Sequence, residues 1–86
     1  MTKYNGWTNY ATWRVNLEMF DGIDPREMYG SDVTLADLTT YLREEARSIL
    51  ENETGEGLAL SYALAFIEDV NWHEIATHML GAYADA

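Results

Sequence analysis

The sequence predicts an all-α protein, a compact bundle of about four helices plus one short helical turn, in a single domain spanning residues 1–86. Three observations support this prediction. Apolar residues recur at helical spacing, residues that cap helices precede these segments, and no stretch sustains the apolar–polar alternation of a β-strand. A hydrophobic content of 48% is sufficient for a globular core at this length.

The first helix is expected from about Asn9 to Phe20. The preceding Asn5-Gly6 is a turn dipeptide, because both residues tolerate positive φ. Thr8 or Asn9 then supplies a cap for the free N–H groups of the helix. Large hydrophobes at offsets 0, 3, 7 and 10 predict a buried stripe formed by Tyr10, Trp13, Leu17 and Phe20. Asp21-Gly22 is expected to end the helix.

Two further helices are expected in the middle of the chain. Asp24-Pro25 indicates a cap followed by a short helical turn that ends before Gly30. Thr34 resembles the first residue of a capping box, and a helix is expected from there to about Glu51. Its buried stripe is predicted to comprise Leu35, Leu38, Leu42, Ala46 and Ile49. Glu44 and Arg47, three residues apart, are expected to pair on its outer side.

The second half of the chain predicts two more helices after a polar turn at residues 52–57. Residues 58–70 are apolar on nearly every side of a helix, which predicts that this helix is the central one of the bundle. Asn71 is expected to cap a last helix that carries Glu74 in its first turn. This helix is expected to continue through Leu80 and to stop at Gly81.

Two sequence blocks carry a resemblance to a known family. Asn5-Gly6-Trp7-Thr8-Asn9-Tyr10-Ala11-Thr12-Trp13 opens the chain, and Val70-Asn71-Trp72-His73-Glu74-Ile75-Ala76-Thr77-His78 lies near its end. They resemble the opening and the ending of a family of small, acidic, mostly uncharacterised proteins encoded by phages, plasmids and bacterial genomes. Members of that family often have Leu-Trp and an Asp-Asn pair after the first helix, where this chain has Leu17 to Gly22. The resemblance implies a mobile-element or bacterial setting and supplies no activity.

Charge is the second informative property of the chain. The net charge is −10, and residues 48–86 carry seven acidic side chains with no Lys or Arg. Such a field repels nucleic acid and anionic membranes and attracts basic proteins. The average density is nevertheless low: roughly 5,000 Å² of surface gives one charge per roughly 500 Å², about five times more dilute than duplex DNA. Mimicry of DNA therefore requires carboxylates gathered on one face.

The residues that suggest metal binding fail on spacing. In the zinc-protease motif two His lie four residues apart and share one helix face. His73 and His78 are five residues apart, about 500° of helix, so their side chains diverge by about 140°. Glu74 and His78, four residues apart, are instead expected to pair, or His78 to be partly buried. We predict no metal site and no cofactor.

Catalytic patterns are also missing from the sequence. Cys is absent, and Ser31, Ser48 and Ser61 lack the Gly-flanked elbow of a nucleophile. Gly55-Glu56-Gly57 lacks the Lys and the further glycines of a phosphate-binding loop. The adjacent carboxylates Glu44-Glu45 and Glu68-Asp69 point about 100° apart on a helix, so neither pair forms an acid–base dyad. We predict that the protein is not an enzyme.

The aromatic residues are expected to serve the core. Trp13 and Trp72 are predicted to be mostly buried, with Trp7 also packed into the core, because aromatics at helical spacing in a small domain usually form its interior. Tyr4 and Tyr83, near the chain ends, are better candidates for exposure or for use in an interface.

These observations predict a non-enzymatic acidic interaction protein from a mobile element. We expect it to inhibit a host-defence nuclease, a CRISPR effector or a restriction enzyme, by occupying the basic nucleic-acid-binding surface of that partner. The expected partner-binding residues are Glu44, Glu45, Glu51, Glu53, Glu56, Glu68 and Asp69. Direct contact with nucleic acid or with a membrane is not expected.

An alternative remains open at this point. The alternative is a structural or regulatory helical module, such as a homodimer, whose acidity serves only solubility. Salt dependence separates the two, because binding by charge weakens at high ionic strength and a hydrophobic dimer barely responds. No basic region followed by an apolar run opens the chain, so a cytoplasmic protein is expected.

Overall fold

The structure, a computed structural model, describes residues 4–82 and confirms the all-α class. No strand occurs in that range; Tyr4 and Trp7 form a single isolated bridge. The helices are α1 (Tyr10–Val15), which continues directly as the π-helical turn η1 (Asn16–Phe20), the short α2 (Pro25–Tyr29), α3 (Leu35–Thr54), α4 (Leu58–Ile67) and α5 (Trp72–Ala82).

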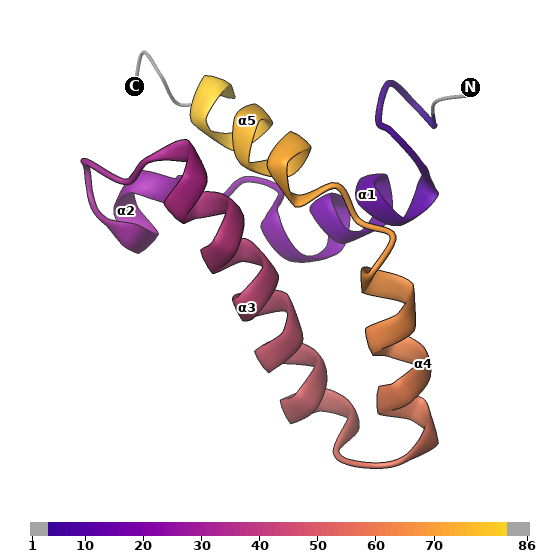
Figure 1. The fold of residues 1–86 in the computed structure, drawn as a ribbon. Helices are drawn as coiled ribbons and strands as arrows, with labels where there is room; N and C mark the ends of the chain where they lie inside the picture. Colours follow the sequence, from indigo (N-terminus) through magenta and orange to yellow (C-terminus); the bar gives the residue numbers. More distant parts are fainter. Residues whose placement is uncertain (1–3, 83–86) are drawn as a thin grey trace.

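The helices α3 and α4 diverge like the arms of a V from the turn that joins them (Figure 1). The helices α1 and α5 lie across the wide end of this V, and α5 packs extensively on α3. The core therefore lies among α1, η1, α3 and α5, and α4 contacts the remainder mainly through its inner side and its last turn. The buried hydrophobic residues of the core are Ala11, Val15, Phe20, Leu38, Leu42, Ala46, Ile67, Val70, Ile75, Ala76 and Met79.

The predicted caps are present at the helix N-termini. The Asn9 side chain accepts from the N–H of Thr12 at 2.9 Å, and Asn71 likewise accepts from the N–H of Glu74 at 3.0 Å. Asp24 and Thr34 cap α2 and α3 in the same way. At the start of the chain Asn5 and Gly6 both have positive φ, 48° and 88°, which is the conformation of a tight type I′ turn.

The two blocks that carry the family resemblance bind each other. The buried Thr12 hydroxyl accepts from the N–H of Asn71 at 2.9 Å and donates to the Asn9 side chain at 2.7 Å. The Asn9 amide donates to the Asp69 carbonyl at 2.8 Å, and the Glu74 carboxylate accepts from the N–H of Thr8 at 2.9 Å. We call this hydrogen-bonded set, Thr8, Asn9, Thr12, Asp69, Asn71 and Glu74, the clasp. It joins the start of α1 to the start of α5.

Removing the Thr12 hydroxyl should weaken the fold measurably. In Thr12→Val the buried hydroxyl is lost and the N–H of Asn71 loses its acceptor in a partly buried hydrogen bond, which costs about 1 kcal/mol or more. Urea denaturation followed by circular dichroism measures this change. The matched control is Thr77→Val, because Thr77 is exposed and its hydroxyl donates only to the carbonyl of His73 in its own helix. Equal urea midpoints for both variants would show that the clasp contributes nothing to stability.

The predicted stripe on the first helix is confirmed at Phe20, which is buried, and is wrong at Tyr10 and Leu17. Tyr10 and Leu17 are exposed, whereas the smaller Ala11, Thr12 and Val15 are buried. Small side chains allow α1 to approach α5 closely enough for the clasp to form. The π turn then brings Phe20, five residues after Val15, to the buried side, because a π-helix has more residues per turn than an α-helix.

Three predicted boundaries in the second half also need correction. The helix α3 continues to Thr54, so the turn comprises residues 55–57. The helix α4 ends at Ile67 instead of Val70, and α5 continues through Gly81 to Ala82. The predicted pair of Glu44 with Arg47 is wrong as well, because Arg47 lies 3.9 Å from Glu51.

The largest correction concerns α4. The sequence predicted a central helix, yet Ile67 is its single buried residue. The helices α3 and α1 cover one side of α4 and leave its other side exposed.

Candidate interaction surface on helix α4

The outward side of α4 carries a row of large apolar side chains. Leu58, Tyr62 and Phe66 are 68%, 70% and 40% exposed. They lie four residues apart, so they follow one face of the helix with a drift of about 40° per step. Ala59 and Ala65 extend the same face, and the ten residues of α4 include no charged side chain. We call Leu58, Tyr62 and Phe66 the apolar stripe.

An aromatic cluster extends the apolar stripe toward the N-terminus of the chain. The rings of Phe66 and Tyr10 are 6.3 Å apart between centroids, and Tyr10 packs edge-on against Tyr4 at 5.1 Å. Tyr4 and Tyr10 are both about 40% exposed. Rings that are half covered by one another and half open to solvent are typical of the anchors of protein interfaces. The exposure predicted for Tyr4 is confirmed, and Tyr83 lies outside the described residues.

An apolar groove of about 300 Å³ runs beside the apolar stripe. Val15, Met19, Leu50, Ala63, Phe66 and Ile67 line it, with Arg14 and Glu18 at its edge. Arg14 donates to the Tyr10 hydroxyl at 3.0 Å and pairs with Glu18 at 3.0 Å. The hydrogen bond to Tyr10, followed by the charges of Tyr10 and Glu18, raises the pKa of Arg14. The charges of Arg14 and Glu18 at the edge of the groove therefore neutralise each other.

The structure places the seven predicted partner-binding carboxylates in three groups. Glu51, Glu53 and Glu56 lie around the turn that precedes α4, and all three are exposed. Glu68 and Asp69 follow the other end of α4, about 15 Å away along the helix. Glu44 and Glu45 lie in the middle of α3, where the charge of Glu45 acts on the partly buried Tyr29 and Glu44 lines a hollow beside Trp72.

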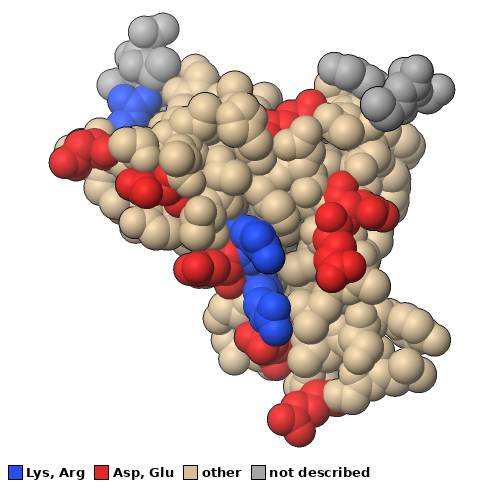
Figure 2. Space-filling model, in the orientation of Figure 1, with Lys and Arg blue, Asp and Glu red and all other residues tan. Residues whose placement is uncertain are grey.

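The carboxylates do not form one continuous patch on the face toward the viewer in Figure 2. Acidic groups are spread around that face, with two adjacent basic side chains near its centre. A row of negative charges that copies the spacing of DNA phosphates is therefore not visible there. What the structure does provide is an uncharged apolar helix with carboxylates beyond each of its ends.

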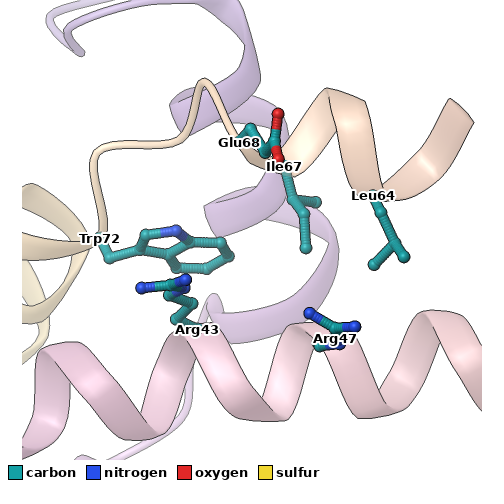
Figure 3. Close-up of a pocket in the computed structure, with 6 residues that line it drawn as sticks. All are labelled: Arg43, Arg47, Leu64, Ile67, Glu68 and Trp72. Carbon is teal, nitrogen blue, oxygen red and sulfur yellow. The ribbon is translucent and has the colours of Figure 1, made fainter. Parts of the chain in front are cut away.

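The V between α3 and α4 contains a cleft of different character. Arg43 and Arg47 of α3 face Leu64 and Ile67 of α4 across it, and Trp72 lies at the end beside Arg43 (Figure 3). Trp72 and Trp13 are both partly buried, Trp72 against the core and Trp13 against Tyr4 and Tyr10. Sequence reasoning did not find this cleft, because residues 43–47 and 64–72 meet only in the tertiary structure.

The two histidines lie apart from any cluster of acidic residues. His78 packs its ring on Trp7 at 4.9 Å, and the Glu74 carboxylate is bound to the N–H of Thr8. Among residues 4–82 no group of three or more His, Asp or Glu side chains is placed to hold a metal ion.

Burial, with a smaller contribution from the charge of Glu45, raises the pKa of Tyr29, so its phenol stays protonated.

No family model, curated protein or solved structure matches this chain. In the described part of the chain no helix is both long enough and apolar enough to cross a membrane.

Proposed function

We propose that this chain is a non-enzymatic binding protein of a mobile element that inhibits a host protein in the cytoplasm. The partner is proposed to be a host-defence nuclease, a CRISPR effector or a restriction enzyme, whose nucleic-acid-binding surface combines an apolar groove with basic residues. The apolar stripe on α4 carries this proposal, because a helix that exposes Leu58 and Tyr62 by more than two thirds is suited to enter such a groove.

The charges around α4 indicate what surrounds the groove. The helix itself is neutral, but Glu53 and Glu56 precede it and Glu68 and Asp69 follow it. A complementary partner has basic residues at both ends of its groove, about 15 Å apart. The wider field of a chain with net charge −10 accelerates encounter with such a partner. Affinity then comes from buried aromatic and aliphatic anchors, and the carboxylates supply orientation and rate.

A homodimer through α4 is the second candidate, since the same apolar stripe invites self-association. Charge argues against it. Antiparallel pairing of two copies places Glu56 of one copy near Glu68 and Asp69 of the other. Parallel pairing places each carboxylate near the same residue of the other copy. Like charges opposed across an interface are costly, whereas basic residues at these places are favourable. Sedimentation separates the candidates: added salt strengthens the homodimer and weakens the complex with a basic partner.

Reversing the carboxylates at the turn tests the charge requirement. The experiment first captures the partner from the native host by affinity purification and mass spectrometry, and then measures binding of the purified proteins. The triple variant Glu51→Lys, Glu53→Lys, Glu56→Lys should lose binding, because attraction becomes repulsion. The fold should persist, since all three residues are exposed and Lys near the C-terminus of α3 is favourable to the helix dipole.

The matched control reverses three exposed acidic residues far from α4 in sequence: Asp21→Lys, Glu27→Lys, Asp32→Lys. Both triple variants change the net charge by the same amount, so a difference between them reports location. Wild-type binding should also weaken from low to high salt, and duplex DNA in excess should displace the protein. A turn variant that binds like the wild type, or a complex that DNA leaves intact, would refute inhibition at a basic nucleic-acid site.

A further inference from the structure

We propose that the cleft between α3 and α4 binds a small organic anion that carries a flat apolar ring. The cleft of about 240 Å³ between α3 and α4 adjoins a second hollow of about 350 Å³ between α3 and Trp72, and both are lined by Arg43, Arg47 and Trp72. These volumes suit a ligand of one or two rings. The cleft shares Ile67 with the groove beside the apolar stripe, but it contains none of Leu58, Tyr62 and Phe66, so the two proposals rest on different side chains.

The guanidinium groups of Arg43 and Arg47 supply the anion-binding half. They lie one helical turn apart on α3, and like charges at this spacing destabilise a helix. In the part of the chain that the structure describes, no ion pair involves Arg43, and Arg47 lies 3.9 Å from Glu51 between exposed side chains. A carboxylate or phosphate bound between the two guanidinium forks removes their repulsion and accepts paired hydrogen bonds.

The apolar half of the cleft faces the guanidinium groups. The Trp72 indole lies beside the Arg43 guanidinium, and Leu64 and Ile67 project from α4 on the opposite wall (Figure 3). A flat ring inserted between this wall and α3 packs against the indole and the two aliphatic side chains. The arrangement therefore recognises a charge at one end of a ligand and an apolar ring at the other.

The backbone positions that carry the cleft side chains are set by the fold. Arg43 and Arg47 lie on the 20-residue helix α3. Trp72 is the first residue of α5 and directly follows Asn71. The N–H of Asn71 donates to the Thr12 hydroxyl, and the Asn71 side chain accepts from the N–H of Glu74. The clasp thus fixes the place from which the indole enters the cleft. Binding to a site that is already ordered costs less conformational entropy.

The surroundings of the cleft select against polyanions. Glu44 and Glu68 line the two hollows, and the whole chain carries a net charge of −10. A nucleic acid brings many phosphates into this field, whereas a monovalent ligand brings one charge that the two guanidinium groups meet directly. The rim carboxylates also accept hydrogen bonds from a ring N–H or O–H. Indole-3-acetate, with a carboxylate, a flat ring and a ring N–H, is therefore a suitable probe.

The test titrates ¹⁵N-labelled protein with indole-3-acetate and follows the indole N–H signals and the backbone amides of α3. We expect saturable shifts at Trp72 and around Arg43 and Arg47. Arg43→Gln should weaken binding by about tenfold or more, because a charged paired hydrogen bond is lost. Gln has a helix propensity close to that of Arg, and this position is exposed, so the fold should be retained. The matched control, Arg14→Gln, removes the guanidinium beside the groove next to the apolar stripe. This variant should bind indole-3-acetate as tightly as the wild type.

Two further ligands test the two halves of the site. Indole-3-acetamide, which has the ring without the charge, should bind at least about tenfold more weakly than the acid. Inorganic phosphate, which has charge without a ring, should bind more weakly than phenyl phosphate. Comparison of phenyl phosphate with phenylacetate identifies the preferred head group, and either order supports the proposal. It is overturned if shifts are not saturable, if Arg43→Gln binds like the wild type, or if the acetamide or inorganic phosphate binds as tightly as its partner compound.

Discussion

The double variant Leu58→Gln, Tyr62→Gln is expected to lose binding to the partner protein while keeping its helical content. These two side chains are the most exposed large apolar residues described on the surface, and they lie one turn apart on α4. Truncating an interface anchor of this kind costs about 2 kcal/mol or more, so the double variant should bind at least about a hundredfold more weakly. Calorimetry with the captured partner measures the loss.

The fold should tolerate this change, because neither side chain contributes to the core. Gln is a better helix former than Tyr and nearly equal to Leu, so α4 should remain helical. The control is Met28→Gln, which removes an exposed apolar side chain on α2. The expectation is contradicted if the double variant binds as tightly as wild type, or if Met28→Gln weakens binding equally. The apolar stripe would then be ordinary surface.

Phe20→Ala is expected to have the largest effect on stability. Phe20 is buried within the core, although it lies in the last turn of η1. Removing a buried Phe side chain leaves a cavity and costs about 3–5 kcal/mol. A chain of 86 residues has about 4–13 kcal/mol in total, so this variant should be partly unfolded at room temperature or melt far below wild type. Thermal and urea denaturation measure the change.

Comparing Trp13→Ala with Phe20→Ala tests the structure against the helical pattern of the sequence. The pattern placed Trp13 and Phe20 on one buried stripe, yet Trp13 is partly buried and packs on Tyr4 and Tyr10 at the surface. Aromatic pairs of this kind add about 0.5–1.5 kcal/mol beyond the area that they bury. Trp13→Ala should therefore cost clearly less than Phe20→Ala. Equal or larger destabilisation by Trp13→Ala would show that the aromatic cluster belongs to the core.

Local interactions explain which features the sequence predicts correctly. A cap acts within three residues, so Asn9, Asp24, Thr34 and Asn71 could be assigned from their neighbours alone. The stripe of α3 was likewise readable, because Leu38, Leu42 and Ala46 repeat at helical spacing between charged residues. The turn at Asn5 follows from two residues that accept positive φ.

The candidate sites were predictable only in part. The seven carboxylates were proposed from charge alone, but their division into three groups depends on where α3 and α4 lie. The apolar stripe was misread as core, because a helix that is apolar on every side does not specify which side its neighbours cover. The cleft was missed, because Arg43 and Trp72 are 29 positions apart in sequence and adjoin only through the packing of α5.

The sequence by itself determined the all-α class, the approximate helices, their caps and the acidic character of the chain. Hydrogen bonds within a turn and side-chain spacing along a helix depend on near neighbours, so they can be read from a short stretch. The tertiary structure decided that the two motif blocks form the clasp, that Val15 and not Tyr10 lies in the core and that one side of α4 stays exposed. Burial of a helix face depends on the positions of all other helices, which no local pattern contains.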